Sequence, residues 1–441
     1  MLLTRPAPAP PASGPAAPRR PVASPAWRHI DVLLVALTGA ISALGVVMVY
    51  STTRFALATA GADPKAEMKK QLIFTVIGIA AFAGTVFFDI VFTGFPHPPA
   101  PGTEVWTTGM GSSPGGIANL AVATSRLGLC TGLAAGFGDD LYGDWMWQVL
   151  RDQEHVDLSR SRRFHAWHTP VTVSLAMDDD RSMVTHGHPP PESVAALLDP
   201  PPPTRAVLAD LGDPEVRSAD WWRTAATQGA LVFADAGWDP EQVWDRRILT
   251  DLADCYAFTP NAQEAMGYTR TDSPQAALRA LADHVPLAVV TRGHEGVIAI
   301  DSATGEEAEV PALDVAAIDP TGAGDVFAAA LVLGTVRGWP LTKRLRFATL
   351  CSSLAVQQFG GSLAAPGWGD IADWWRDVRT RADAGESSAR ETAGAYSFLT
   401  ECLAGMTTRR VRRAEATIAR FSDADLASPD AEPPTAPSSG Q

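Results

Sequence analysis

Asp319-Pro320-Thr321-Gly322-Ala323-Gly324-Asp325 leads directly into residues 326–333, an apolar segment rich in alanine and leucine. That composition favours a buried helix, so the heptapeptide is predicted to form the turn at the helix N-terminus. Backbone N–H groups at such a terminus lack intrahelical partners and can hold phosphate oxygens, and glycines allow close approach. Asp325 could then accept the proton of an attacking hydroxyl group. A lone glycine turn with an aspartate cap is at least as common, so this interpretation needs further motifs.

Three further motifs lie upstream in the sequence. The first is Gly115-Gly116-Ile117-Ala118-Asn119, followed by Leu127-Gly128 and by residues 138–143. The second is the N-x-x-E pattern of Asn261 and Glu264, and the third is the segment of residues 291–296, Thr-Arg-Gly-His-Glu-Gly. Together with the heptapeptide, these motifs resemble the signatures of the ribokinase-like (pfkB) carbohydrate kinases over about residues 89–375. Four matches in the order of the family form a specific signal.

The resemblance implies a fold and a reaction. The fold would be a ribokinase-like layered α/β domain with a mainly parallel central sheet and a small β lid over the sugar site. The reaction would be ATP-dependent phosphorylation of a hydroxyl group on a small sugar, a sugar-like molecule or a nucleoside, with Asp325 as general base. The backbone of Gly322, Ala323 and Gly324 would form the anion hole for the transferring phosphoryl group. ATP and Mg²⁺ are the expected cofactors, K⁺ is a further candidate, and a homodimer is compatible with the resemblance.

The resemblance also implies ligand contacts. The expected sugar contacts are Asp89, Gly115, Gly116 and Asn119. The expected nucleotide contacts are Asn261, Glu264, Thr291, Gly293 and Gly296. Asn261 and Glu264 would also position hydrated Mg²⁺, and Asp319 and Thr321 are candidates for a monovalent-cation site. Outside these motifs, Asn119 would be interpreted as a polar residue on a helix surface, and N-x-x-E is as often a helix cap as a metal site.

Composition limits the classes of partner. The chain has 441 residues and a formal net charge of −14, which argues against a nucleic-acid partner bound through its phosphates. Its cysteines, Cys130, Cys255, Cys351 and Cys402, form no C-x-x-C pair, so neither a zinc site nor a disulfide framework is indicated. A reducing cytoplasm suits this composition, and the kinase-like part is expected there.

The N-terminal region has a different composition. Residues 1–28 are rich in proline and alanine and are expected to be disordered. Residues 30–50 form a nearly uncharged run long enough to cross a membrane as a helix, and residues 71–88 form a second apolar run. These runs predict an apolar helical segment over residues 29–88 with one or two membrane spans. Arginines before the first span would return the later part of the chain to the cytoplasm, with the full chain anchored in the inner or plasma membrane.

Part of this region resembles another family. His29-Ile30-Asp31, the segment of residues 45–51 and that of residues 69–74 resemble the first two spans of the SEDS membrane glycosyltransferases. This likeness covers about ninety residues, so no polymerase activity is carried over. A membrane anchor or a gene fusion explains it better. A fused, membrane-anchored chain that binds ligand without turnover is therefore the alternative function.

The two resemblances conflict between residues 77 and 88. The kinase family places a first strand there, ending at a sugar-binding aspartate, which would be Asp89. A segment cannot be both a lipid-embedded helix and a strand inside a soluble sheet, because each needs its own hydrogen-bond partners. Either these residues join the sheet and the second span is too short, or they form the span and the kinase loses a central strand.

Beyond this junction, strands and helices alternate, which favours a layered α/β domain over residues 89–380. Residues 170–177 alternate in polarity as a lid strand would. A helical extension is expected over residues 381–421 and a disordered tail over residues 422–441. Four histidines near the lid have spacings that fit no metal template well, which favours a surface or substrate-contacting role: His165, His168, His186 and His188.

Overall fold

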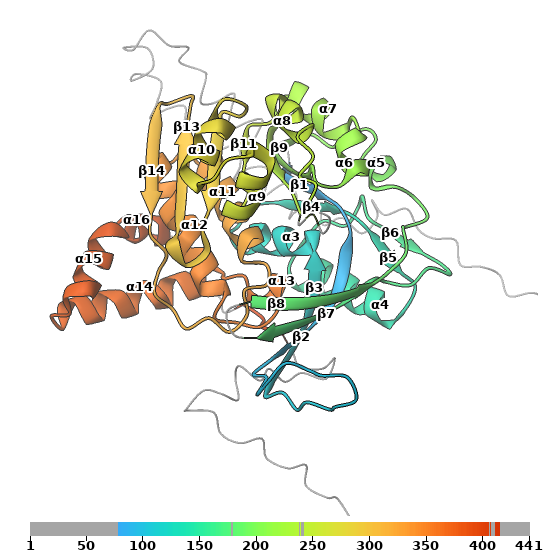
Figure 1. Cartoon of the computed structure of the whole chain (residues 1–441), viewed down its shortest axis with the longest axis horizontal. Coiled ribbons are helices and arrows are strands. Elements are labelled where there is room, and N and C mark those ends of the chain that lie inside the picture. Colours follow the sequence, from blue (N-terminus) through green and yellow to red (C-terminus); the bar gives the residue numbers. More distant parts are fainter. Residues whose placement is uncertain are drawn as a thin grey trace, which may run out of the picture. The chain divides into compact units, whose positions relative to one another are not determined.

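The computed structural model describes residues 78–404 except 178, 179, 238, 240 and 241, together with residues 406 and 411–414. The larger of its sheets has eight strands in the order β14-β13-β12-β11-β10-β9-β1-β4 (Figure 1). Pairing is parallel from β4 to β12 and antiparallel at β13 and β14. The strands are β1 (Gly78–Ala83), β4 (Thr131–Ala134), β9 (Thr204–Asp210), β10 (Leu231–Asp235), β11 (Ala257–Phe258), β12 (Leu287–Thr291), β13 (Val297–Asp301) and β14 (Glu306–Val310). The prediction of a mainly parallel central sheet is confirmed.

Helices cover both faces of this sheet, because side chains alternate between the faces along each strand. In β9, for example, Leu208 packs with one set of helices and Val207 with the other. The first set comprises α3 (Ile117–Arg126), α4 (Leu141–Gln148), α11 (Ala323–Val336), α12 (Leu341–Ala355), α14 (Trp368–Asp383) and α16 (Leu399–Leu403). The second set comprises α5 (Val194–Leu197), α6 (Pro214–Ser218), α7 (Trp221–Thr227), α8 (Ile248–Asp251), α9 (Ala262–Thr269) and α10 (Pro274–Ala282). Both faces of the sheet are therefore buried, as a mainly parallel sheet requires.

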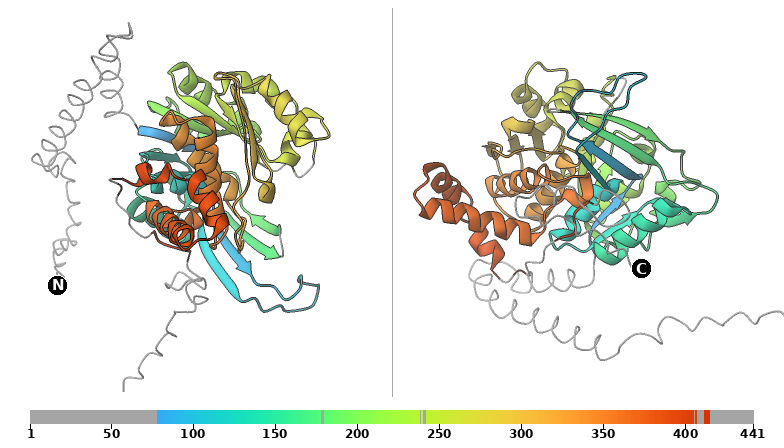
Figure 2. Two further views of the ribbon diagram at one scale, coloured as in Figure 1. Left: turned by 90° about the vertical axis from the view of Figure 1, so that its left-hand side faces the viewer. Right: turned by 90° about the horizontal axis from the view of Figure 1, so that it is seen from below.

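A second sheet of four strands forms the lid and has the order β3-β2-β7-β8. Its strands are β2 (Val86–Thr93), β3 (Gly109–Gly116), β7 (Val171–Met177) and β8 (Asp180–His186). The strand predicted over residues 170–177 is β7. Figure 2 shows β2 and β3 projecting from the body of the domain. Two short parallel strands, β5 (Gly136–Gly138) and β6 (Arg162–Phe164), form a third sheet.

Residues 78–88 of the junction are part of the kinase-like domain. β1 lies between β4 and β9, where Ala80 pairs with both Thr131 and Ala206, and the chain then enters the lid as β2 after Gly84 and Thr85. The apolar helix predicted up to residue 88 is therefore wrong for residues 78–88, because their backbone groups are paired within the two sheets. A domain start at residue 89 would likewise divide β2.

The predicted span of residues 30–50 lies outside the described residues, as do residues 71–77 of the second predicted span. Within the part of the chain that the structure describes, no helix is both long enough and apolar enough to cross a bilayer. The predicted disordered regions, residues 1–28 and 422–441, are also outside the described residues.

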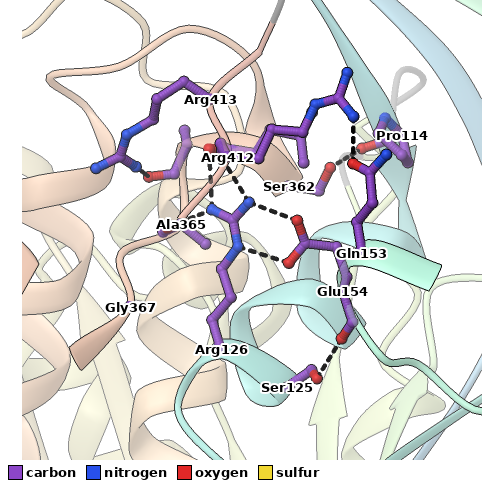
Figure 3. Close-up of polar contacts among 12 residues, drawn as sticks. Pro114, Ser125, Arg126, Gln153, Glu154, Ser362, Ala365, Gly367, Arg412 and Arg413 are labelled. Carbon is purple, nitrogen blue, oxygen red and sulfur yellow. Dashed lines mark hydrogen bonds and ion pairs between the residues drawn. The ribbon is translucent and has the colours of Figure 1, made fainter. Parts of the chain in front are cut away.

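The C-terminal part continues the first helical layer. After α13 (Gly361–Ala364), the long helix α14 crosses residue 380, where the kinase domain was predicted to end, and is followed by α15 (Ser387–Ala395) and α16. Helix is thus present in the first part of the predicted extension, residues 381–421. Residues 411–414 are not helical, and the contacts of Arg413 with Ala364 and Asp370 place them near α13 and the start of α14 (Figure 3).

Candidate active site

The Asp319–Asp325 segment leads into α11. Gly322 is the N-cap of this helix, and Asp325 lies in its first helical turn. Gly322 has φ of +73°, and a Cβ atom there would lie 2.7 Å from the Cα of Gly361. Both constraints require glycine. The turn thus presents the first backbone N–H groups of a 14-residue helix to a cavity.

Asp319 holds this turn against the loop that precedes α13. Its carboxylate oxygens accept hydrogen bonds from the backbone N–H of Thr321 and of Gly360, each at 2.9 Å. The hydroxyl oxygen of Thr321 is buried and has no hydrogen-bond partner among the described residues. The structure therefore gives Asp319 a clear part in shaping the turn, and its assignment to a monovalent-cation site stays a prediction.

Asn119 lies on the first turns of α3 and contacts the candidate base directly. Its side-chain Nδ2 donates a 2.8 Å hydrogen bond to Oδ2 of Asp325. Asn119 is only 5% exposed, and its Oδ1 atom has no hydrogen-bond partner within the described part of the chain. A buried carbonyl oxygen without a partner is costly, so this atom could accept a hydrogen bond from a ligand hydroxyl group.

Asp89 lies on β2 in the lid sheet, paired with Ser113 of β3 and Thr172 of β7. A Cβ atom at Gly115 would lie 1.8 Å from the Asp89 carboxylate, so Gly115 leaves the space that this carboxylate occupies. Gly116 has φ of +63°, and a Cβ there would lie 2.4 Å from the carbonyl oxygen of Thr85. Glycine at these two positions therefore allows the start of β2 and the end of β3 to pack closely.

Burial alters the acidity of both carboxyl groups. Desolvation, reinforced by the charges of Asp319 and Asp325, raises the pKa of Asp89 to about 8, against a lowering by Arg181. Desolvation raises the pKa of Asp325 to about 6, against lowering by the Asn119 hydrogen bond and by Arg181. Asp325 is therefore a base with a pKa near neutral pH, which suits proton transfer from a hydroxyl group.

A cavity of about 460 Å³ opens beside the turn. All five predicted nucleotide-binding residues line it, and so do the predicted base and the three residues of the predicted anion hole: Asn261, Glu264, Thr291, Gly293, Gly296, Asp325, Gly322, Ala323 and Gly324. Asp89, Gly115 and Asn119 do not line this cavity, although Asn119 reaches it through Asp325. The predicted phosphoryl-transfer residues thus line one cavity, and among the predicted sugar contacts Asn119 is joined to it by its hydrogen bond to Asp325.

Asn261 and Glu264 form a capping box at the start of α9. Glu264 N–H donates to Asn261 Oδ1 at 3.0 Å, and Asn261 N–H donates to Glu264 Oε2 at 2.9 Å. The helix-cap interpretation of N-x-x-E is therefore correct, and it is compatible with ligand binding because both residues also line the cavity. Thr291, at the end of β12, forms a bridge with Asn261.

Two charged residues of the cavity were not predicted from the sequence. Asp235 is the last residue of β10, where burial and the charges of Asp325, Asp210 and Glu264 raise its pKa well above the ordinary value. A polar residue at the carboxyl end of a parallel strand is a signal that could have found it. Arg181 comes from β8 of the lid, and its charge lowers the pKa of both Asp89 and Asp325. No local pattern marks Arg181, because the lid pairing brings it to the site.

Comparison with known proteins agrees with this geometry. The sequence pattern of the pfkB family of carbohydrate kinases matches residues 106–367. A fructokinase of Klebsiella pneumoniae is 30% identical over 279 residues, 57% of this chain and 89% of the relative. A ribokinase of Bacillus subtilis is 27% identical over 288 residues, 64% of this chain and 94% of the relative. A 5-dehydro-2-deoxygluconokinase of Geobacillus thermodenitrificans is 24% identical over 308 residues, 64% of this chain and 89% of the relative.

Solved structures share the fold. Arabidopsis thaliana ribokinase, solved with ribose and ATP, has a TM-score of 0.56 at 20% identity and covers 68% of this chain and 98% of its own. A Cryptococcus neoformans ribokinase, solved with ADP, has a TM-score of 0.55 at 21% identity and covers 67% of this chain and 99% of its own. These matches do not support the resemblance of the first ninety residues to SEDS proteins, nor a gene fusion or a membrane anchor. The chain belongs to the pfkB family of carbohydrate kinases, and its fold is ribokinase-like.

Proposed function

We propose that this protein transfers the γ-phosphoryl group of ATP to a hydroxyl group of a small sugar or sugar-like substrate, with Asp325 as the general base. The observation that carries the proposal is the position of Asp325, which lies on the first turn of α11, lines the cavity and accepts a hydrogen bond from Asn119. The relatives named as fructokinase, ribokinase and 5-dehydro-2-deoxygluconokinase support a hydroxylated carbohydrate as acceptor.

The proposed step is a single displacement at phosphorus. The substrate hydroxyl oxygen forms a bond to the γ-phosphorus while the bond to the β–γ bridging oxygen breaks, and the hydroxyl proton passes to the Asp325 carboxylate. The products are a phosphate monoester and ADP. The backbone N–H groups of residues 322–324 would face the charge that develops on the transferring group, although that of Ala323 already donates to the carbonyl oxygen of Pro320 at 3.2 Å. The positive end of the α11 dipole would add to this stabilisation.

Magnesium fits the acidic side of the cavity. Asp235, Asn261 and Glu264 line it with oxygen atoms, the ligand type that Mg²⁺ prefers. Burial, and then repulsion from the neighbouring carboxylates, raises the pKa of Asp235. We assign these three residues to Mg²⁺, in part through water. When bound, the ion would neutralise phosphate charge. Thr291, Gly293 and Gly296 are assigned to the nucleotide.

The acceptor is assigned to the lid side of Asp325. Asn119 Oδ1, which is buried without a partner among the described residues, would accept from a substrate hydroxyl group, and Asp89 would bind a neighbouring hydroxyl. Asp89 is neutral at pH 7 when its pKa is about 8, so it could donate one hydrogen bond as well as accept. The role of Gly115 is to leave room for Asp89.

The test is substrate-dependent ADP formation. The purified full chain would be assayed with ATP, Mg²⁺ and a panel of ribose, fructose, a keto-deoxy sugar acid and a nucleoside. We expect turnover with at least one acceptor, and a loss of at least about 100-fold in kcat for Asp325→Asn. The exposed carboxylate variant Asp272→Asn is the matched control and should retain the wild-type rate. Equal rates for Asp325→Asn and the wild type would exclude Asp325 as the base.

A further inference from the structure

Three histidines meet at one end of the β7–β8 hairpin. In the hairpin, Val171 pairs with His186, so residues before β7 and after β8 emerge side by side. His168 lies three residues before β7, His186 ends β8, and His188 follows two residues later. Their ring centroids are 5.0–5.3 Å apart.

The ring nitrogens of these histidines converge. One nitrogen from each of His168, His186 and His188 can be chosen so that all three lie within 4.8 Å of one another. Around a tetrahedral Zn²⁺ ion with Zn–N bonds of about 2.0–2.1 Å, ligand nitrogens are about 3.4 Å apart. Small side-chain rotations would therefore bring the three nitrogens to bonding distance. His186 and His188 are exposed, so a fourth position would be open to water.

The surrounding contacts support one arrangement of the cluster. Nδ1 of His168 lies 3.1 Å from the carbonyl oxygen of Thr169, and donation to that oxygen leaves Nε2 with a free lone pair. Thr169 is itself fixed, because its N–H and hydroxyl groups both donate to Asp140. In metal sites, the second ring nitrogen of a ligating histidine commonly donates to a backbone carbonyl group, which fixes the orientation of the ring.

Gly187 allows the strands to approach closely at this point. A Cβ atom there would lie 2.8 Å from Cβ of Pro170, so a larger residue would push His186 and His188 away from His168. The sequence His186-Gly187-His188 and the segment 168–170 are therefore packed so that the three imidazoles face one another. None of the three histidines lines the 460 Å³ cavity, so the cluster lies outside the phosphoryl-transfer site.

We propose that His168, His186 and His188 bind a first-row transition-metal ion, with Zn²⁺ as the probe. Three neutral imidazoles without a carboxylate suit zinc, copper or nickel and are poor ligands for Mg²⁺. The ion would join the two ends of the β7–β8 hairpin and so stabilise the lid strand that carries Arg181. This inference is independent of the proposed kinase reaction.

The first test is zinc binding by equilibrium dialysis. The untagged, chelator-treated full chain would be dialysed against Zn²⁺ in excess Mg²⁺, which occupies oxygen-rich sites. We expect one Zn²⁺ per chain, and at least about tenfold weaker binding for His186→Ala and for His188→Ala. His165→Ala is the matched control, since His165 is a nearby histidine that pairs with Asp139 and is not part of the cluster. Absence of Zn²⁺ binding by the wild type would overturn the proposal, as would wild-type affinity in both cluster variants or equal loss in His165→Ala.

The second test separates binding at the cluster from a folding defect. Without metal, His186→Ala and His188→Ala should have the wild-type Tm, because both side chains are exposed. With Zn²⁺, the Tm of the wild type and of His165→Ala should rise, while the Tm of the double variant His186→Ala/His188→Ala should not. An equal rise in the double variant would place the zinc elsewhere and overturn the proposal.

Discussion

Asn119 and Asp325 are 206 residues apart in the sequence and are joined by a 2.8 Å hydrogen bond between the side-chain amide and the carboxylate. The bond connects the first turns of α3 and α11, two helices of the same layer. It favours the charged form of Asp325 against the effect of burial, which alone would raise the pKa further. The acid limb of the pH–rate profile should therefore depend on Asn119.

Replacing Asn119 with alanine should move that acid limb to higher pH. In the wild type, kcat/KM should fall as the pH drops through about 6, because Asp325 must be ionised to accept a proton. Without the Asn119 hydrogen bond the pKa of Asp325 rises, and we expect a shift of about one pH unit. Gln228→Ala, which removes an exposed amide at the end of α7, should leave the profile unchanged. An unchanged acid limb in Asn119→Ala would show that Asp325 is not the titrating group.

Asp89→Asn should increase stability at high pH and weaken acceptor binding. The pKa of Asp89 is about 8 in the folded protein and near 3.8 in the unfolded chain. The folded state thus binds the proton more tightly, and wild-type stability falls as the pH rises from about 4 to 8. Asparagine does not titrate, so the free energy of unfolding of the variant relative to the wild type should grow by more than about 1 kcal/mol between about pH 5 and about pH 9.

Thermal and chemical unfolding across this pH range would measure the effect. The exposed variant Asp272→Asn serves as control, and its difference from the wild type should stay nearly constant. A constant difference for Asp89→Asn as well would mean that Asp89 is ionised throughout. The second expectation, weaker acceptor binding, is measured separately as an increase in KM for the acceptor without a matching change in KM for ATP.

The local structures formed by short motifs could be predicted from the sequence. The Asp319–Asp325 turn, the helix that follows it and the N-x-x-E cap each depend on neighbours within a few residues, and the structure has all three. The cavity also collects the predicted nucleotide contacts, because the carboxyl ends of parallel strands and the starts of the following helices meet at one edge of a sheet.

Features that depend on pairing between strands distant in the sequence were either not predicted or predicted wrongly. Residues 78–88 are apolar enough for a helix, and only their pairing with β4, β9, β3 and β7 makes them strands. β3 has the sequence Gly-Met-Gly-Ser-Ser-Pro-Gly-Gly, which has little strand propensity, and its register with β2 compensates for that. His168 and His186 gave no metal template because the β7–β8 register, rather than sequence spacing, brings them together.

Gly322→Ala should damage catalysis more than stability alone explains. Its positive φ of +73° and the nearby Gly361 Cα leave no room for a methyl group, so the backbone N–H groups of the turn must move. We expect a loss of about 100-fold in kcat, the usual cost of one lost donor to a developing oxyanion. Gly394→Ala in α15 is the matched control, because no atom lies within 4 Å of its added Cβ, and it should keep full activity. A folded Gly322→Ala enzyme with the wild-type kcat would show that this turn does not form the anion hole.

Arg126→Met should destabilise the protein strongly, because Arg126 is the centre of a buried network at the end of α3 (Figure 3). Its guanidinium donates twice to Glu154, at 2.8 Å each, and also to the carbonyl oxygens of Leu363, Ala365 and Arg412. The side chains of Arg126 and Glu154 are only 3% and 6% exposed. Removing the arginine leaves the glutamate buried and unpaired, which should cost about 3–5 kcal/mol.

The matched control is Arg376→Met, which breaks a pair of similar length with Asp373 on the surface of α14, where the arginine is 72% exposed. That variant should lose no more than about 1 kcal/mol. The double variant Arg126→Met/Glu154→Gln should recover part of the stability, because the remaining side chain no longer carries a charge. Since α3 also carries Asn119, the Tm and the kcat of Arg126→Met should fall together. A similar Tm for Arg126→Met and Arg376→Met would mean that the buried pair contributes no more than a surface pair.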